Sequence, residues 1–87
     1  MEKVLEKQIV RYVLGTIYED DGRCYYLRSL HDIGKYDYVF DIELATKAEK
    51  KSVIKMLLQN YRMDIGKDAL DFVILPVVIE YSLVKEV

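Results

Sequence analysis

The sequence has no tryptophan and only one cysteine, one histidine and one proline in 87 residues. The single cysteine, Cys24, excludes an internal disulfide and suits a reducing compartment. No apolar run approaches the roughly 20 residues of a membrane helix, and Pro76 interrupts the longest one, 72–79. The charged segment 1–7 does not resemble a signal peptide. We therefore expect a cytoplasmic protein that does not associate with membranes.

Length and composition predict one globular domain over residues 1–87. Hydrophobic residues make up 52% of the chain and charged residues 32%, which excludes intrinsic disorder. The net charge is −2, but segment 46–67 carries six Lys/Arg against two Asp/Glu and lies between acidic segments. A strongly basic DNA-binding protein is therefore not indicated by the total charge, although the surface should be dipolar.

Residues 8–28 have the pattern of a β-hairpin. Segment 8–18 is rich in β-branched and aromatic residues and predicts a strand, in which Gly15 marks a bulge or a close backbone approach. Asp21-Gly22 is a typical hairpin turn signal, and residues 24–28 form the return strand. A third short strand is expected at about 36–42.

A helix is predicted from Lys47 to about Met63. Thr46 and Glu49 fit a capping box, in which each side chain accepts a hydrogen bond from the backbone N–H of the other residue. Gly66 is a suitable C-terminal stop. At 100° per residue, one apolar face is expected to meet the core, formed by Val53, Ile54, Leu57, Leu58 and Tyr61.

The last strand is expected at about 71–84, where every odd position from Val73 to Leu83 is apolar. We expect that face to meet the helix or the core. Phe72, Ile74 and Val78 would then lie on the opposite face, under residues 1–8, a second copy or a partner. Pro76 marks an edge or a bulge. The fold class is α+β, with a three- to four-stranded antiparallel sheet, one helix packed on one face, and the order ββ(β)αβ.

One motif suggests chemistry: segment 30–35, with His31 and Asp32, resembles the His-Asp core of the HD-domain metal phosphohydrolases. That resemblance implies a divalent metal that activates hydroxide. The family is all helical and needs further ligands, whereas His31 is the only histidine and here lies between predicted strands. A polar turn containing Gly34 fits better. Cys24 is expected to be a small sheet residue. We therefore expect no enzyme, no cofactor and no metal site.

Tyrosine is the most unusual component, with eight residues. Tyrosine suits strands, but it is also enriched at protein interfaces. The helix flank adds a cationic stripe, which either is merely solvated or contacts an acidic partner. The candidate partner-binding residues are Tyr12, Tyr18, Tyr25, Tyr26, Tyr38, Lys51, Lys55 and Arg62. The alternative for the same residues is nucleic acid, bound by aromatic stacking and lysine contacts.

The order of these features resembles small accessory proteins of bacteriophages and prophages of Gram-positive bacteria. The features that carry the resemblance are the Tyr-rich hairpin with its Asp-Gly turn, the sequence Ala45-Thr46-Lys47 before a Lys-rich helix, and a closing strand that ends in valine. The resemblance implies a non-enzymatic inhibitor of a bacterial host protein, such as an anti-CRISPR protein that blocks a CRISPR effector. Independently of the resemblance, a homodimer would cover the second apolar face of the closing strand. No functional residue is implied by the resemblance.

Overall fold

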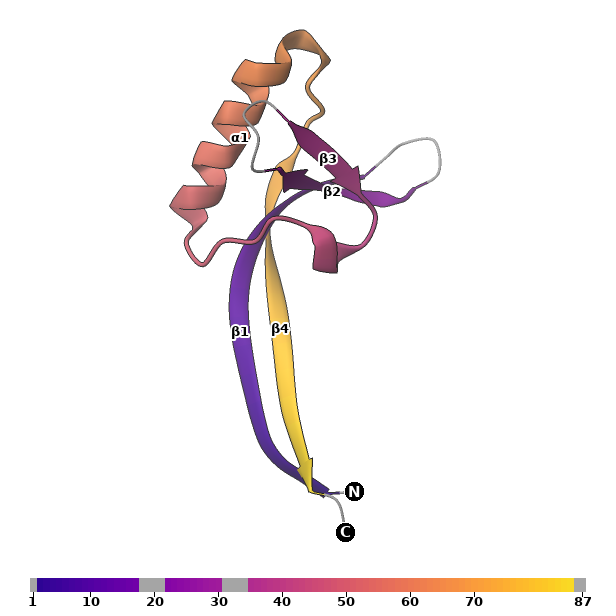
Figure 1. Cartoon of the computed structure of the whole chain (residues 1–87), viewed down its shortest axis with the longest axis vertical. Helices are drawn as coiled ribbons and strands as arrows, with labels where there is room; N and C mark the ends of the chain where they lie inside the picture. The colour runs from indigo at the N-terminus through magenta and orange to yellow at the C-terminus, as the bar shows by residue number, and fades with distance from the viewer. Residues whose placement is uncertain (1, 18–21, 31–34, 86–87) are drawn as a thin grey trace.

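The computed structural model describes the backbone of residues 2–17, 22–30 and 35–85, and side chains between residues 7 and 81 of these segments. One helix packs against a four-stranded antiparallel sheet of strand order β3-β2-β1-β4 (Figure 1). The α+β prediction is therefore confirmed. The elements are β1 (Glu2–Ile17), β2 (Cys24–Ser29), β3 (Tyr36–Val39), the 3₁₀ helix η1 (Ile42–Leu44), α1 (Lys51–Ile65), the 3₁₀ helix η2 (Gly66–Asp68) and β4 (Val73–Lys85).

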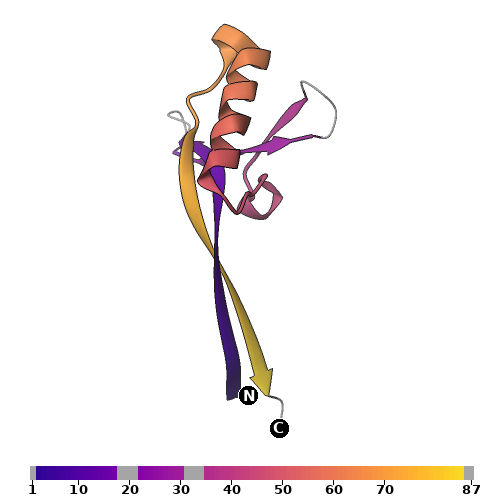
Figure 2. The ribbon, with the colours of Figure 1, turned by 90° about the vertical axis from the view of Figure 1, so that its left-hand side faces the viewer.

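The sheet has two parts of different width. β1 pairs with β4 along its length, from Gly15 opposite Val73 to Glu2 opposite Lys85, but it pairs with β2 only over Gly15–Ile17. Beyond Tyr12 the strands therefore continue as a two-stranded arm, residues 2–11 and 77–85, which projects from the head formed by the other elements (Figures 1 and 2). The radius of gyration is 16.0 Å, whereas a compact domain of this length has about 12 Å.

The segment Thr46–Ala48 fills the space where β1 and β2 diverge. Ala48 and Tyr12 exchange two backbone hydrogen bonds, of 2.8 and 3.0 Å. On the other side, the Thr46 N–H donates to the Leu27 carbonyl (3.1 Å) and the Ser29 N–H donates to Thr46 Oγ1 (2.7 Å). These bonds supply partners for backbone groups of β1 and β2 that can no longer pair with each other where the two strands separate.

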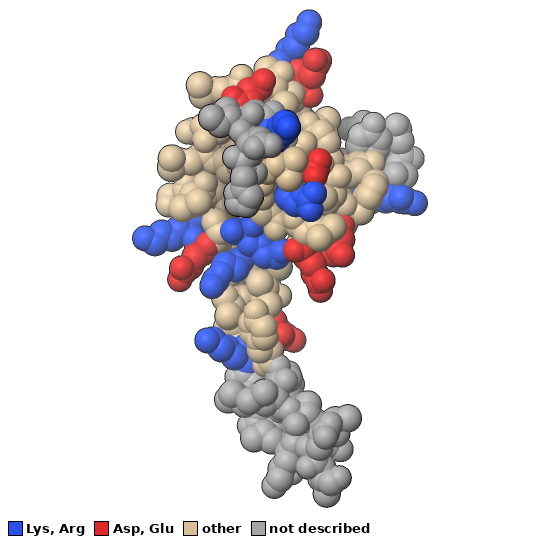
Figure 3. All heavy atoms as spheres, in the orientation of Figure 1, with Lys and Arg blue, Asp and Glu red and all other residues tan. Residues whose placement is uncertain are grey.

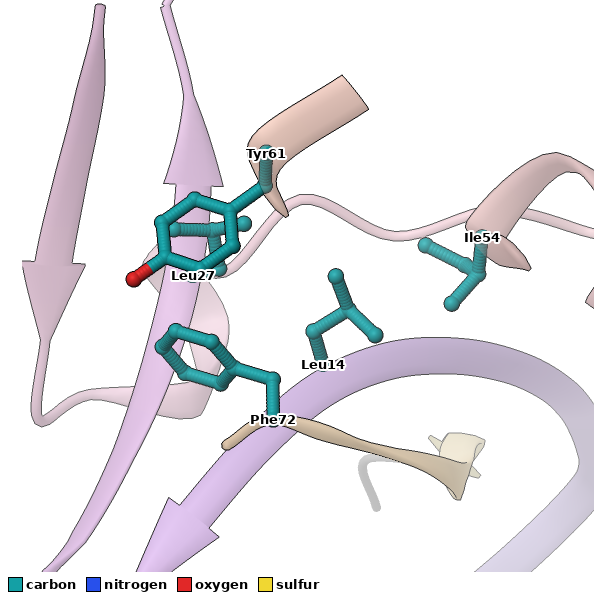
Figure 4. Close-up of a cluster of buried hydrophobic side chains, with 5 residues drawn as sticks. All are labelled: Leu14, Leu27, Ile54, Tyr61 and Phe72. Carbon is teal, nitrogen blue, oxygen red and sulfur yellow. The ribbon is translucent and has the colours of Figure 1, made fainter. Parts of the chain in front are cut away.

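The core lies between α1 and one face of the sheet. Five fully or almost fully buried side chains meet there: Leu14, Leu27, Ile54, Tyr61 and Phe72 (Figure 4). They come from β1, β2, α1 and the start of β4, so the cluster joins the helix to three parts of the chain that are distant in sequence. Leu57 and Leu58 pack against it and are half-buried.

The predicted faces of β4 are wrong. Phe72, just before β4, is 2% exposed and Ile74 packs on the core cluster, whereas Val73 is 55% exposed. The cross-strand register explains the difference, because Ile74 lies opposite Leu14 and so shares its core face. The odd-numbered residues lie on the other side of the sheet. Pro76 is on an edge strand, as predicted.

The predicted helix start is also wrong. α1 begins at Lys51, four residues later than expected, and its N-cap residue, Lys50, makes no capping hydrogen bond through its side chain. Thr46 does not cap the helix because its hydroxyl is bonded to the Ser29 N–H. Val53, expected in the core, is 51% exposed. Gly66 ends the helix with a φ of 75°, as predicted.

The predicted hairpin is present, but its turn differs. A two-residue Asp21-Gly22 turn would place Cys24 opposite Glu19, whereas Cys24 lies opposite Ile17. Residues 18–23 therefore connect the strands, and most of that connection lies outside the described residues. Gly22 has a φ of 70°, a value that favours glycine. The third strand ends at Val39, before the expected Ile42, because the chain turns into η1.

Thr46→Ala is expected to lower the free energy of unfolding by about 1 kcal/mol, because it leaves the partly buried Ser29 N–H without its acceptor. Thr46→Ser retains the hydroxyl and should recover most of that loss. Glu49→Ala is the matched control. It would be destabilising if Glu49 belonged to a capping box, but the structure shows no capping box, so its effect should be small. Urea denaturation of the three variants measures these values. Equal losses for Thr46→Ala and Glu49→Ala would support the capping box instead.

Candidate functional site

The five candidate tyrosines do not form one surface. Tyr12, Tyr25 and Tyr38 lie on the side of the sheet that faces α1. Tyr12 and Tyr25 are each two residues from a core residue of the same strand, Leu14 or Leu27, and Tyr38 lies directly opposite Leu27. Tyr26 lies on the opposite side, paired with Gly15. Tyr18 lies outside the described residues. Tyr12 packs against the core cluster and is half-buried, which leaves Tyr25 and Tyr38 as the candidates on one side.

A second group of tyrosines is structural. The hydroxyls of Tyr38 and Tyr61 lie 2.9 Å apart, and the Leu70 N–H donates to the Tyr61 hydroxyl at 2.8 Å. Tyr36 donates to the Asp64 carboxylate at 2.5 Å and its ring meets Tyr61 edge to face. Burial raises the pKa of Tyr36 and of Tyr38 to about 12, helped by these hydrogen bonds. Both hydroxyls therefore stay neutral to a higher pH than an ordinary tyrosine, and their hydrogen bonds tie β3 to α1.

An aromatic hollow opens beside this network. We define it by the four residues that line it, Tyr25, Tyr38, Asp68 and Leu70. They come from β2, β3 and the connection between α1 and β4, so only the tertiary fold brings them together. Tyr38 keeps 43% of its surface exposed although its ring stacks on Phe72, with 6.1 Å between the ring centroids.

Phe40 lies next to the hollow, against the ring of Tyr25, and lines a neighbouring hollow with Arg23, Cys24 and Tyr26. Its ring lies 4.4 Å from the Tyr25 ring, and 52% of its surface is exposed. The Arg23 guanidinium carbon lies 5.4 Å from the centre of the Phe40 ring, within the range of a cation–π contact. Exposed aromatic rings beside an arginine have the composition of an interface hot spot. Sequence analysis missed Phe40, Asp68 and Leu70, because none belongs to a local motif.

The hollow combines aromatic faces with a negative charge. Asp68 is exposed and makes no ion pair or hydrogen bond with any described residue. Aromatic ring faces attract cations, and a carboxylate fixes them by a charge-assisted hydrogen bond. The arrangement therefore suits the cationic head of a lysine or arginine from another molecule, with its aliphatic stem against Leu70 and the rings.

The basic stripe is present on α1 as predicted. Lys51, Lys55 and Arg62 are all exposed, and helix geometry places them on one side of α1. None of the three forms an ion pair within the described part of the chain. Lys47 does not extend the stripe, because its ammonium group donates to the carbonyls of Glu43 and Ala45, at 2.8 and 3.2 Å.

The remaining candidates are His31, Asp32 and Cys24. His31 and Asp32 lie outside the described residues, and no group of three or more potential metal-ligating residues occurs in the segments that are described. Cys24 is half-buried and not in a disulfide. Its hydrogen bond with Tyr26, together with burial, raises the pKa of the Tyr26 hydroxyl. Across the described segments, no helix has both the length and the apolar character needed to cross a membrane.

Comparison with known proteins gives no further guide to this surface. No protein-family model matches the chain, and neither a curated protein nor a solved structure matches it.

Proposed function

We propose that the protein is a non-enzymatic protein-binding module and that the aromatic hollow is its binding site. The observation that supports this most is the exposed ring of Tyr38 beside Asp68, whose carboxylate has no ion pair or hydrogen bond with a described residue. The partner we propose is a protein that presents a lysine or arginine to this hollow. The resemblance to phage accessory proteins would make it a bacterial host protein whose function is inhibited by the contact.

The chemistry of the hollow favours a protein side chain over a small metabolite. The hollow is open to solvent, since Tyr38 and Asp68 in its lining are exposed, whereas small-molecule sites enclose most of their ligand. Phe40 and Tyr38 are already held in place by Tyr25, Tyr61 and Phe72, so little side-chain entropy is lost when a partner binds. A preorganised aromatic surface of this kind is typical of protein interfaces.

Affinity capture from bacterial lysate with paired variants tests the proposal. Phe40→Ala and Asp68→Asn change exposed side chains and should leave folding intact while weakening partner binding by at least about tenfold. The matched control replaces Lys51, Lys55 and Arg62 by alanine and should retain the partner. Binding of a captured protein that survives nuclease treatment and follows this pattern supports the proposal. Capture that is unaffected by Phe40→Ala and Asp68→Asn contradicts it.

The alternative function is nucleic-acid binding through the basic stripe, which the absence of ion pairs for Lys51, Lys55 and Arg62 within the described residues favours. The same triple variant tests it with a single-stranded oligonucleotide. Binding through phosphates would be lost in that variant and would weaken steeply as salt rises, because counterions are released. The aromatic-hollow variants would change oligonucleotide binding little.

A further inference from the structure

The outer edge of β4 carries backbone groups that no described strand pairs with. Their direction follows from Tyr12, whose N–H and C=O both bond to Ala48, on the side away from β4. Pro76 lies opposite Tyr12, so the backbone groups of Pro76 also point away from β1. By the alternation of an antiparallel ladder, the backbone groups of Val78 and Glu80 point to the same outer edge.

The two edges of the arm differ in charge. The β1 part of the arm, residues 2–11, contains five charged residues, Glu2, Lys3, Glu6, Lys7 and Arg11, whereas the β4 part, residues 77–85, contains two, Glu80 and Lys85. Figure 3 shows few charged atoms on the described part of the arm, between the head and the atoms that are not described. Charges on an edge strand discourage pairing with another chain. The β4 edge therefore discourages pairing less than the β1 edge does, and a hollow lies beside it, lined by residues 77–80 together with Ile42, Glu43 and Lys47.

The arm also carries more apolar surface than it covers. Ile9, Val77, Ile79 and Tyr81 share one face by register, and Tyr81 is 56% exposed. Val78, on the other face, is also 56% exposed. A two-stranded ribbon is marginally stable in water, and three or more strands with an apolar face are needed for independent stability. Additional strands would therefore stabilise the arm.

We propose that the β4 edge pairs with the β4 edge of a second copy of this chain, with the two-fold axis at Ile79. The arm then becomes one half of a four-stranded sheet of order β1-β4-β4-β1. Ile79 lies opposite Ile79 of the second copy, and Val77 lies opposite Tyr81, so the apolar face continues across the interface. This surface is separate from the aromatic hollow, and the inference does not depend on the proposed function.

Charge and hydrogen bonding select this register. An axis at Glu80 would place the two Glu80 side chains directly opposite each other, which is unfavourable. An axis at Val78 would place Pro76, which has no N–H, opposite Glu80 and lose hydrogen bonds close to the centre. With the axis at Ile79, Val78 faces Glu80 of the second copy, and Pro76 moves to the end of the paired region. Glu80 stays bonded to Gln8, whose side-chain amide donates to it at 2.8 Å.

Cysteine cross-linking of the full chain tests the register. In a Cys24→Ser background, Ile79→Cys places two thiols at a pair without backbone hydrogen bonds, where the Cα atoms lie about 4.5 Å apart, a distance that a disulfide spans. Mild oxidation should convert most of the protein to a covalent dimer. Val77→Cys is the matched control, since its two copies would be four residues out of register, about 13 Å apart. It should remain uncross-linked.

Charge substitution gives an independent test by sedimentation equilibrium. Val78→Glu places a glutamate opposite Glu80 twice per dimer, and Val78→Lys places a lysine there. A Lys–Glu pair across two strands is favourable and a Glu–Glu pair is unfavourable, and each pair occurs twice in the dimer. Val78→Lys should therefore dimerise at least about tenfold more tightly than Val78→Glu. The difference should shrink at high salt. Neither change touches the aromatic hollow.

Several outcomes would overturn the inference. The first is a wild-type chain that stays monomeric at all accessible concentrations and an Ile79→Cys variant that does not cross-link. That result would mean that a different protein pairs with this edge. Cross-linking at Val77→Cys instead of Ile79→Cys would exclude the register. A third is a dimer whose dissociation constant is unchanged by both Val78 substitutions but which dissociates when Met56→Lys is introduced. That result would place the interface on α1, where Val53, Met56 and Met63 are exposed.

Discussion

Phe72→Ala is expected to lower the free energy of unfolding by about 3–5 kcal/mol, whereas Val73→Ala should lower it by less than about 1 kcal/mol. Phe72 is 2% exposed, meets the Tyr61 ring edge to face with 5.3 Å between centroids, and belongs to the core cluster. Removing its ring leaves a cavity that rigid neighbours cannot fill. Val73 is 55% exposed, so alanine there removes little buried surface.

Guanidinium denaturation of the two variants measures the difference directly. The pair is informative because the two residues are adjacent in sequence and lie on opposite faces of the chain, one buried and one exposed. If the odd-numbered face of β4 met the core, as alternation alone predicts, Val73→Ala would be the costly change. A loss for Val73→Ala equal to or greater than that for Phe72→Ala would contradict the register of β1 and β4 described here.

The sequence could predict elements but not the faces of β4. Its early positions are apolar on both sides, from Phe72 through Ile74 to Val78, so alternation cannot identify the core side. The core side is set instead by the pairing of Ile74 with Leu14, a contact between distant parts of the chain. Pro76 and Gly66 were predictable, because their backbone constraints are local.

Local signals also failed where a distant partner competed. The Thr46–Glu49 pattern fits a capping box, but in the structure the Thr46 hydroxyl accepts a hydrogen bond from the Ser29 N–H instead. Gly15 is a second example. The sequence predicted a bulge or a close backbone approach, but the pairing with β4 is regular at Gly15, and it is side chains that lie close: a Cβ there would be 2.8 Å from Leu75 Cδ1 and 3.3 Å from Tyr26 Cδ1.

The candidate site could be predicted only in part. Tyrosine abundance pointed to Tyr25 and Tyr38, which do line the hollow. The same abundance could not separate them from Tyr36 and Tyr61, which do not line the hollow and whose hydroxyls bond to Asp64 and to the Leu70 N–H. That distinction depends on the hydrogen bonds from Tyr36 to Asp64 and from the Leu70 N–H to Tyr61. Each of these bonds joins two different elements of the fold, so no local sequence pattern predicts it.

Tyr61→Ala is expected to have an effect at least as large as Phe72→Ala. Tyr61 is fully buried on α1, and its ring contacts Tyr36, Tyr38 and Phe72. Loss of the ring should cost about 3–5 kcal/mol. Loss of the hydroxyl, which accepts from the Leu70 N–H, should add about 1–3 kcal/mol. Since small domains are stable by only about 5–15 kcal/mol, Tyr61→Ala can unfold the chain entirely.

Tyr61→Phe separates the two contributions and remains measurable if Tyr61→Ala does not fold. It keeps the ring contacts but leaves the Leu70 N–H and the Tyr38 hydroxyl without their partner at Tyr61. We expect a loss of about 1–3 kcal/mol in urea denaturation. Tyr38→Phe is the matched control: it removes only the hydroxyl pair and retains the bond from Leu70, so its loss should be smaller. A Tyr61→Phe variant as stable as the wild type would show that the hydroxyl does not anchor the connection between α1 and β4.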